Sequence, residues 1–306
     1  MELFVSLLVE FGKTLIKLAP YVIVCGIAFP ILTRYFACNP EQKPWWQRDG
    51  LVTDVCYWFV VPVLTRFLRI GLAVIGAALI FGIHGEKALV AFYDNGHGPL
   101  SELPFWFQVA LYLVVSDFLL YWSHRLFHGV KLWKYHAIHH ATEDVDWISA
   151  ARFHPVNLSL GTVIVDVVLL LCGITPEVLA ILVPFNVLMS AFVHANLNWT
   201  LGPFKYVIAS PVFHRWHHTA LDRGGDKNFA STFPVLDLMF GTFYMPANEL
   251  PSHYGIGEPD FPTTFGGQLL YPLKDKPQPS IVPAMDAAGM APAMDTPAPA
   301  RASFES

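Results

Sequence analysis

The stretch PFWFQVALYLVVSDFLLYWSHRLFH, residues 104–128, brings a long apolar run directly up to two histidines. A helix that crosses a membrane needs roughly 20 mostly apolar residues, and the run from Pro104 to Trp122 meets that requirement. His124 and His128 stand four residues apart, so they share one face of such a helix. The sequence therefore predicts a membrane-crossing helix that carries both imidazoles at one end.

The composition of the chain also favours a membrane protein. Of its 306 residues, 54% are hydrophobic and 14% are charged, and its mean hydropathy is positive. The formal net charge of -5 includes no basic run that would neutralise phosphates, which excludes nucleic acid as a partner. The N-terminus lacks the pattern of a removable signal peptide, so the first apolar segment is expected to remain. Four widely spaced cysteines favour neither a disulfide framework nor a thiolate metal site: Cys25, Cys38, Cys56 and Cys172.

The other apolar segments predict an all-α, multi-pass membrane bundle of about four to five spans. Residues 15–36 form the first span. Within residues 52–83, Arg66 and Arg69 interrupt the apolar run. This favours an interfacial helix to about residue 64, followed by a span over residues 67–83 with both arginines snorkelling at its entrance.

Histidines recur in two later motifs, HAIHH at residues 136–140 and HRWHH at residues 214–218. In each motif, spacings of three and four residues place the imidazoles on one helix face. Neutral imidazole is a favoured ligand of iron, zinc and copper. The eight imidazoles of the three motifs exceed the four ligands of a tetrahedral zinc site. The pattern therefore favours a pair of metal ions with positions left open for oxygen or water.

Two later apolar segments are expected to bring the third histidine motif to the same side of the membrane as the first two. Residues 156–172 and 178–193 read as a membrane hairpin, with a turn that contains Gly173 and Pro176. Since a hairpin brings the chain back to the side it left, all three motifs are expected on one face, as a histidine-rich helical cap. The positive-inside tendency assigns this face to the cytosol. Its basic residues are Arg125, Lys131, Lys134, Arg152, Lys205, Arg215, Arg223 and Lys227.

The three motifs resemble the HxxxH, HxxHH and HxxHH boxes of the fatty acid hydroxylase superfamily, which includes sterol desaturases and sterol methyl oxidases. The resemblance covers residues 117–244 and extends to RFHP at 152–155, HANLN at 194–198 and DLMFGTFY at 237–244. It implies a non-haem di-iron centre that uses O2 to hydroxylate or desaturate a C–H position of a lipid such as a sterol or a fatty acyl chain. The metal ligands that it implies are His124, His128, His136, His139, His140, His214, His217 and His218, with His194 as a ninth.

Two polar residues near the motifs have open roles. Asn198 lies four residues after His194, so it is expected on the same helical face. It could then bind metal weakly, bind through water, or only form hydrogen bonds. His154 precedes a proline, whose ring disfavours helical geometry at His154, so a supporting or structural role is favoured over ligation.

Buried carboxylates are candidates for supporting the ligands. Asp117 lies seven residues before His124 on the same stripe of a helix. Its carboxylate could accept the spare N–H of a ligand histidine and fix the tautomer, although a purely structural partner is the alternative. Asp166 is open to the same interpretation, and Asp237 is a further candidate for contact with the ligands near the third motif.

The chain contains no recognisable haem-binding domain, dinucleotide fingerprint or cysteine iron–sulfur run. A separate electron-donor protein is therefore expected to reduce the metals. Zinc could replace iron in recombinant material, because the order of metal affinities does not favour Fe2+. The alternative function is a membrane metal-ion transporter or a metal-binding or storage protein without redox catalysis.

The composition divides the chain into four regions. They are N-terminal membrane helices and loops (1–103), a histidine-motif domain with its hairpin (104–250), a polar extension (251–274) and a disordered tail rich in proline and alanine (275–306).

Overall fold

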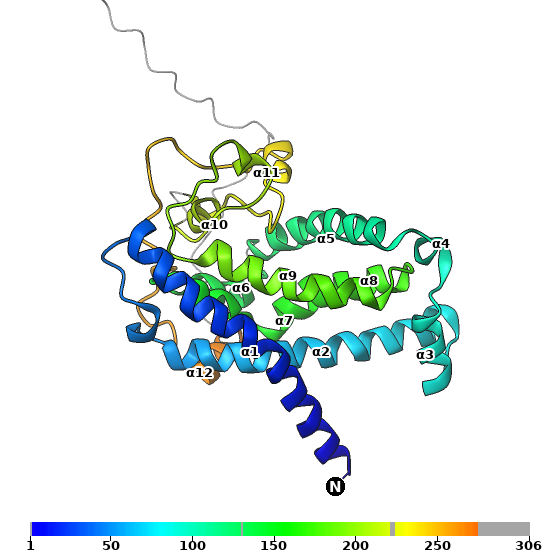
Figure 1. Cartoon of the computed structure of the whole chain (residues 1–306). Coiled ribbons are helices and arrows are strands. Elements are labelled where there is room, and N and C mark those ends of the chain that lie inside the picture. Colours follow the sequence, from blue (N-terminus) through cyan, green and yellow to red (C-terminus); the bar gives the residue numbers. More distant parts are fainter. Residues whose placement is uncertain (1, 130, 221–223, 275–306) are drawn as a thin grey trace, which may run out of the picture.

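The computed structural model describes residues 2–129, 131–220 and 224–274 (Figure 1). Within these ranges every regular element is a helix, and the one β pairing is an isolated bridge between Thr219 and Tyr254. The predicted all-α class is confirmed. The tail predicted for residues 275–306 and the basic residue Arg223 lie outside the described residues.

Four of the described helices are long and apolar enough to cross a membrane: α1 (Glu2–Phe36), α2 (Leu51–Phe81), α5 (Phe105–Phe127) and α9 (Pro176–His194). In Figure 1, α2, α5 and α9 run roughly parallel, whereas α1 crosses them at an angle and its N-terminal part projects from the bundle. A fifth apolar segment, Pro155–Leu171, is shorter. The predicted multi-pass helical bundle of four to five spans agrees with this arrangement.

Helix α2 differs from the prediction because it is one continuous helix and not an interfacial helix followed by a span. The two arginines do not lie at the entrance of a span. Each instead binds a polar side chain of a neighbouring helix. Arg66 Nη1 donates to Thr14 Oγ1 of α1 at 3.1 Å, and Arg69 Nε donates to Asp166 Oδ2 at 2.7 Å. Since these contacts satisfy both guanidinium groups laterally, the helix needs no break to bring them to water.

The fifth apolar segment bends at its middle. It consists of α7 (Pro155–Leu158), the π-helical turn η3 (Ser159–Val163) and α8 (Ile164–Leu171). Gly161 has non-helical backbone angles (φ -97°, ψ -109°), and single π turns of this kind are frequent near functional sites. The bend lies between Asn157, at the histidine end, and Asp166, inside the bundle.

Short helices and 3-10 turns are divided between the two ends of the bundle. In Figure 1, α3 (Glu86–Asp94) and α4 (Gly98–Ser101) lie at one end. The other end carries a cap that contains all three histidine motifs. Its elements are α6 (Trp133–His140), α10 (Pro211–His217), α11 (Val235–Met239), α12 (Phe265–Leu270), η1 (Trp45–Gln47), η2 (Trp147–Ala151), η4 (Gly202–Tyr206) and η6 (Tyr271–Leu273).

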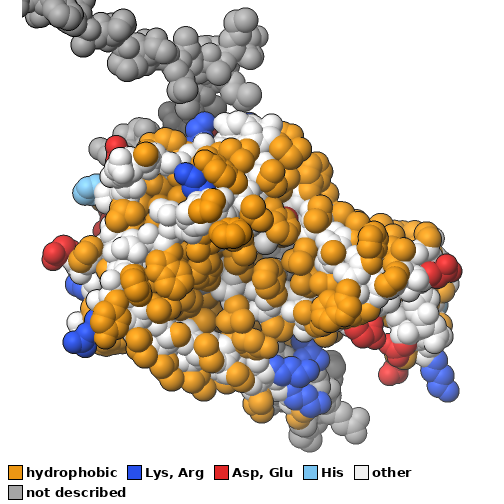
Figure 2. Space-filling view, turned by 45° about the horizontal axis from the view of Figure 1, so that its top comes forward, with side chains coloured by type: hydrophobic (Ala, Val, Ile, Leu, Met, Phe, Trp, Pro, Cys, Tyr) orange, Lys and Arg blue, Asp and Glu red, His pale blue; other side chains and the backbone are white. Residues whose placement is uncertain are grey.

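The core and the surface of the bundle are both apolar. Tyr112, Leu169 and Leu182 belong to a buried cluster that joins α5, α8 and α9. On the outside, Leu79 of α2 is 81% exposed and Ile23 of α1 is 59% exposed. Hydrophobic side chains cover much of the face in Figure 2. Because a soluble monomer rarely exposes so large an apolar surface, these helices suit a lipid environment.

The polar extension after residue 250 folds back onto both parts of the molecule. The ring of Phe265 contacts that of Tyr57 in α2, with centroids 4.8 Å apart. Tyr271 packs with Trp133 and Ala137 of α6 in a small buried cluster. The extension thus helps to fix α6, which carries the second histidine motif.

Candidate metal centre

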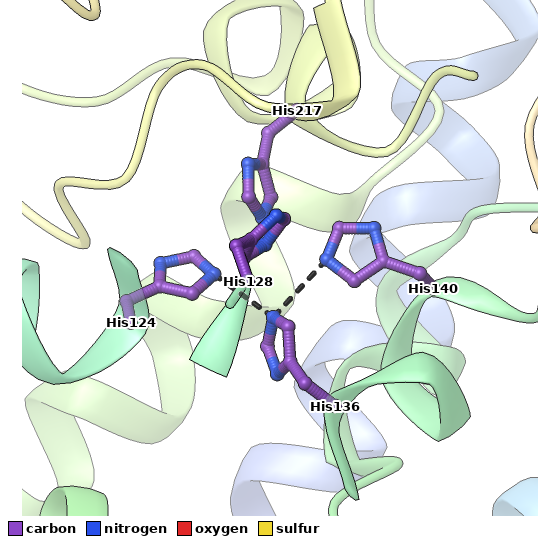
Figure 3. Close-up of side chains that lie close together, drawn as sticks. All are labelled: His124, His128, His136, His140 and His217. Carbon is purple, nitrogen blue, oxygen red and sulfur yellow. Dashed lines mark hydrogen bonds between the residues drawn. The ribbon is translucent and has the colours of Figure 1, made fainter. Parts of the chain in front are cut away.

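Nine histidines converge inside the cap in two groups, and in each group the candidate ligand atoms all lie within 4.8 Å of one another. Figure 3 shows the rings of the first group turned toward a common point. The structure thus brings histidines of all three motifs together, as the sequence predicted. The first group is His124, His128, His136, His140 and His217, and the second is His139, His194, His214 and His218.

Helix ends bring these side chains together. His124 lies in the last turn of α5 and His128 caps it, whereas His194 is the last residue of α9. The helices α6 and α10 each contribute to both groups: α6 sends His139 to the second group, and α10 sends His217 to the first. The spacing of the motifs predicted a shared face for each helix but not this exchange.

The first group places unprotonated nitrogens against one another. His124 Nδ1 lies 2.8 Å from the carbonyl oxygen of Phe229, and His136 Nδ1 lies 2.8 Å from Asn157 Oδ1. Because both oxygens can only accept, we assign the ring proton to Nδ1 in each case. The two Nε2 atoms, 3.0 Å apart, then face each other with lone pairs. A cation between them would turn this repulsion into attraction.

The second group has the same property around His194. Its Nδ1 lies 2.7 Å from the carbonyl oxygen of Ser190, which leaves Nε2 without a proton. That Nε2 lies 3.1 to 3.2 Å from Nε2 of His139, His214 and His218. Nitrogens that bind one ion at about 2.0–2.1 Å lie about 2.9–3.4 Å apart at octahedral to tetrahedral angles. The observed spacing therefore fits coordination of one ion.

Burial keeps the imidazoles in the form that binds metal. Desolvation lowers the pKa of His140, His217 and His218 well below the ordinary value, and neighbouring histidines lower it further. The rings are therefore neutral at physiological pH. Neither group includes a carboxylate among the described residues. An all-imidazole donor set suits iron, zinc or copper and not magnesium or calcium.

Two buried carboxylates hold the loop that supports His124. Asp237 accepts hydrogen bonds from the backbone N–H of Phe229 and Ala230, at 2.8 and 2.9 Å, and from the Thr242 hydroxyl at 2.6 Å. Burial raises the pKa of this carboxyl, and these donors counteract the rise. Since Phe229 supplies the oxygen for His124 Nδ1, Asp237 acts on the site through the loop.

Asp117 has the structural role that the sequence left as an alternative, because its carboxylate receives the backbone N–H of Thr232 and Phe233, at 2.9 and 2.8 Å, and not a histidine N–H. The seven residues between Asp117 and His124 correspond to about 10 Å along a helix. At the level of Asp117, the loop that contains Thr232 and Phe233 contacts α5, whereas the imidazoles lie nearer the end of the helix. Asp166 likewise binds Arg69 and Tyr112 and lies inside the bundle.

The two residues with open roles lie outside both groups. Helix α9 ends at His194, where Ala195 adopts extended angles (φ -55°, ψ 144°). The expectation that Asn198 shares a helical face with His194 is therefore wrong, and Asn198 is exposed. His154 caps α7 through Nδ1, which accepts from the N–H of Val156 at 3.1 Å. Its contacts are structural.

Arg215 was not predicted to have a role beyond its charge, yet its side chain is fully buried between the motifs. Its Nη1 donates to the carbonyl oxygens of Val145 and His194, at 2.5 and 3.1 Å. Its Nη2 donates to Asn39 Oδ1 and Gln42 Oε1, at 2.5 and 3.1 Å. The guanidinium thus ties α10 to the end of α9 and to the connection after α1.

Aromatic rings close the site on several sides. Phe153 stacks on His139 with centroids 4.3 Å apart, and Trp133 lies 5.2 Å from His128. Phe229 contacts His124 at 5.6 Å. Phe153 belongs to the RFHP element quoted above, which was the one sequence signal for its role. Nothing in the sequence pattern distinguished Phe229.

Comparison with known proteins agrees with this geometry. A family model described as fatty acid hydroxylase matches residues 109–242. Ornithine lipid hydroxylase OlsE from Rhizobium tropici is 27% identical over 228 residues, which cover 74% of this chain and 67% of that protein. Alkylglycerol monooxygenase from Danio rerio is 32% identical over 177 residues, 56% of this chain and 38% of that protein. Methylsterol monooxygenase 2-2 from Arabidopsis thaliana is 29% identical over 142 residues, 44% of this chain and 52% of that protein.

This chain therefore spans well under two thirds of the alkylglycerol and methylsterol monooxygenases. No solved structure matches. The chain combines buried histidine groups that could hold metal ions with helices long and apolar enough to cross a membrane, and the relatives are named as hydroxylases and monooxygenases. Over residues 109–242 the chain is thus similar to the fatty acid hydroxylase family, which agrees with the resemblance noted in the sequence.

Proposed function

We propose that this protein is an O2-dependent membrane hydroxylase that inserts one oxygen atom into a C–H bond of a lipid with the help of two iron ions. The observation that carries the proposal is the convergence of buried, neutral imidazoles whose lone pairs face one another. The site lies at the end of a bundle with an apolar outer surface. The names of the relatives, which include hydroxylases and monooxygenases of lipids, support the reaction class.

Each histidine group would hold one iron. Bound iron would supply the redox chemistry that an unactivated C–H bond requires, because such a bond offers no acidic proton to a base. The overall reaction consumes the lipid, O2, two electrons and two protons, and it yields the hydroxylated lipid and water. We propose that a separate donor protein supplies the electrons, since this sequence contains no recognisable haem, dinucleotide-binding or iron–sulfur motif.

The chain itself positions the imidazoles and excludes water. Oxygen atoms of Phe229, Asn157 and Ser190 hold the Nδ1 protons of three histidines, which fixes their tautomers and directs Nε2 inward. The rings of Phe153 and Trp133 cover the histidines from the side. Such a dry, rigid site suits a reactive oxidant that water would quench.

We further propose that the histidine end faces the cytosol, where lysine and arginine are concentrated, so that the lipid enters from the bilayer and electrons arrive from solution. Labelling of introduced cysteines with an impermeant reagent tests this orientation. Reaction of a cysteine at Lys131, which is exposed in the cap, only after the membrane is opened supports it. Reaction in sealed cells contradicts it.

Comparative lipid mass spectrometry of cells with and without the gene tests the activity. We expect one lipid class to gain the mass of an oxygen atom. His139→Ala and His217→Ala, one from each group, should abolish that gain. His84→Ala is the matched control, because His84 is exposed at the opposite end of the bundle. Loss of two hydrogens would instead assign a desaturase.

Metal analysis of the purified protein tests the cofactor independently of activity. We expect two ions per chain in the wild-type protein, and activity after reconstitution with Fe2+ under reducing conditions. Zinc in recombinant material is compatible with the proposal, because Zn2+ binds such ligands more tightly than Fe2+ does. Metal-dependent transport in liposomes without any lipid product would contradict an enzyme.

A further inference from the structure

An apolar groove runs between α1 and α2 on the side of the bundle near the cap. Its volume is about 200 Å3. Ala19 and Ile23 of α1 form one wall, Phe59 of α2 forms the other, and Trp147 lies at its base. The groove is distinct from the histidine groups, and none of its lining side chains is charged.

The groove has an open rim and a closed base. At the rim, Ile23 is 59% exposed and Phe59 is 47% exposed, whereas Trp58, Trp147 and Ile148 are buried at the base. The indole N–H of Trp58 donates to the carbonyl oxygen of Ile148 at 2.7 Å, so these polar atoms satisfy each other. The indole N–H of Trp147 is buried and has no partner among the described residues, whereas the other groups at the base offer carbon.

The position of the rim identifies the occupant. Both walls belong to helices long and apolar enough to cross a membrane, so the rim opens where lipid surrounds the protein. A charged or polar ligand would lose its hydrogen bonds with water and would find no charged partner, and at most the single Trp147 indole N–H, in this groove. A hydrocarbon chain loses nothing on entry and is the main component of the surrounding phase.

The base of the groove adjoins the second histidine group. Trp147 belongs to one buried cluster with Ala191 and Ala195, which lie on either side of His194 in the chain. Two residues after the end of η2, which begins with Trp147, Phe153 stacks on His139. The segment 147–153 thus closes the groove with Trp147 and contacts the second group with Phe153.

We propose that this groove holds the hydrocarbon chain of the lipid substrate, and that Trp147 closes its inner end beside the second histidine group. This inference rests on the proposed function. Trp147 is held rigidly, because the rings of Trp45 and Trp58 lie 5.3 and 5.8 Å from it. A fixed stop at the base limits how far a chain enters the groove, so it would set the register of the rest of the lipid relative to the metal site.

A pair of tryptophan substitutions on α1 tests the groove. Ala19→Trp would fill it, because Ala19 is an exposed lining residue whose replacement disturbs no core. Ile27→Trp is the matched control, since Ile27 is 59% exposed on the same helix and does not line the groove. We expect Ala19→Trp to lower hydroxylation about tenfold or more, the scale on which apolar pockets discriminate ligands, with metal content unchanged. The control should retain wild-type hydroxylation.

Photo-crosslinking measures occupancy without catalysis. The probe is a phosphatidylcholine with a diazirine at the end of one acyl chain, in nanodiscs of unlabelled phosphatidylcholine. We expect adducts on Trp58 or Trp147 in the wild-type protein and in the inactive His139→Ala variant. Ala19→Trp should remove them and Ile27→Trp should not. Absence of adducts at the base, or normal hydroxylation by Ala19→Trp, overturns the inference.

The two experiments separate this inference from the proposed function. Adducts at the base in a protein that never hydroxylates lipid would overturn the proposed function and, with it, the substrate assignment of the groove. Hydroxylation by a protein without adducts would overturn the groove alone. Trp147→Phe provides a further readout, because a shorter stop should shift the hydroxylated carbon along the chain while the metal content stays the same.

Discussion

The two histidine groups are built in different ways. The first depends on a loop, because His124 and His217 place their Nδ1 atoms 2.8 and 2.6 Å from the carbonyl oxygens of Phe229 and Lys227. The second depends on helix ends, because His194 bonds to Ser190 within its own helix. A loop-supported group should respond to changes in the loop, whereas a helix-supported group should respond to changes in its own ligands and in helix packing.

The largest expected effect is the loss of His194, whose Nε2 is the centre of the second group. His194→Ala leaves the second group with three imidazoles. We therefore expect the variant protein to hold one ion per chain, where the wild-type protein holds two. The proposed hydroxylation of lipid should fall about a hundredfold or more. Inductively coupled plasma mass spectrometry of the purified variant gives the metal content.

His128→Ala provides the comparison for that experiment. The first group retains four imidazoles without His128, which is as many as the second group has in full. We therefore expect a metal content close to that of the wild-type protein. If His128→Ala loses as much metal as His194→Ala, the two groups do not differ in redundancy.

A smaller effect, confined to the first group, is expected from Asp237→Asn. The amide keeps the volume of the carboxylate, but its NH2 replaces one of the two oxygens and so opposes the backbone N–H of either Phe229 or Ala230. We expect the first ion to bind about 10 to 100 times more weakly. The free energy of unfolding should fall by about 1 to 3 kcal/mol, since a buried donor loses its acceptor.

Metal titration followed by the absorption of bound Co2+ separates the two ions in this variant. Asp94→Asn is the control, because Asp94 is exposed in α3, at the end of the bundle away from both histidine groups. Equal weakening of both ions by Asp237→Asn would refute the assignment of the loop to the first group.

The different supports also explain how much of the site the sequence could predict. Apolar runs predicted the helices, and spacings of three and four residues predicted which histidines share a face. The identity of the ligand candidates followed from the resemblance. These features depend on residues close together in the chain or on a pattern of side-chain types, so they can be predicted from a single sequence.

The rest depends on contacts between distant segments. Whether His139 joins the same group as His136 is determined by how α6 and α10 pack, not by the motif. The groups of Phe229 and Lys227 that accept the histidine N–H are backbone carbonyl oxygens. Since every residue has such an oxygen, the sequence does not reveal which one is used. Asn198 was misplaced because the end of α9 at His194 had no glycine or proline to mark it.

An effect of about tenfold on the second group is expected from Arg215→Lys. Lysine keeps the charge but cannot reach the four oxygens that the planar guanidinium bonds at once. The carbonyl of His194 loses its donor, so we expect the second ion to dissociate about ten times faster while the first is unaffected. Release of metal to a chromophoric chelator measures both rates. Equal acceleration for both ions would show a general loosening of the cap.

The smallest expected effect is on the affinity of the first ion when Asn157 is replaced. Its direction is informative, because two different substitutions should shift the affinity in opposite directions. Of the four hydrogen bonds from histidine Nδ1 to oxygen among the described residues, only that of His136 uses a side chain, Asn157. Asn157→Asp keeps the acceptor and adds negative charge, which raises the basicity of the His136 ring, so the first ion should bind a few times more tightly. Asn157→Leu removes the acceptor and should weaken binding by a similar factor. Opposite shifts in the affinity of the first ion, measured by competition with a chelator, require that His136 donates from Nδ1 and offers Nε2 to the metal. Shifts in the same direction would mean that Asn157 acts only through packing, and that the tautomer of His136 is set elsewhere.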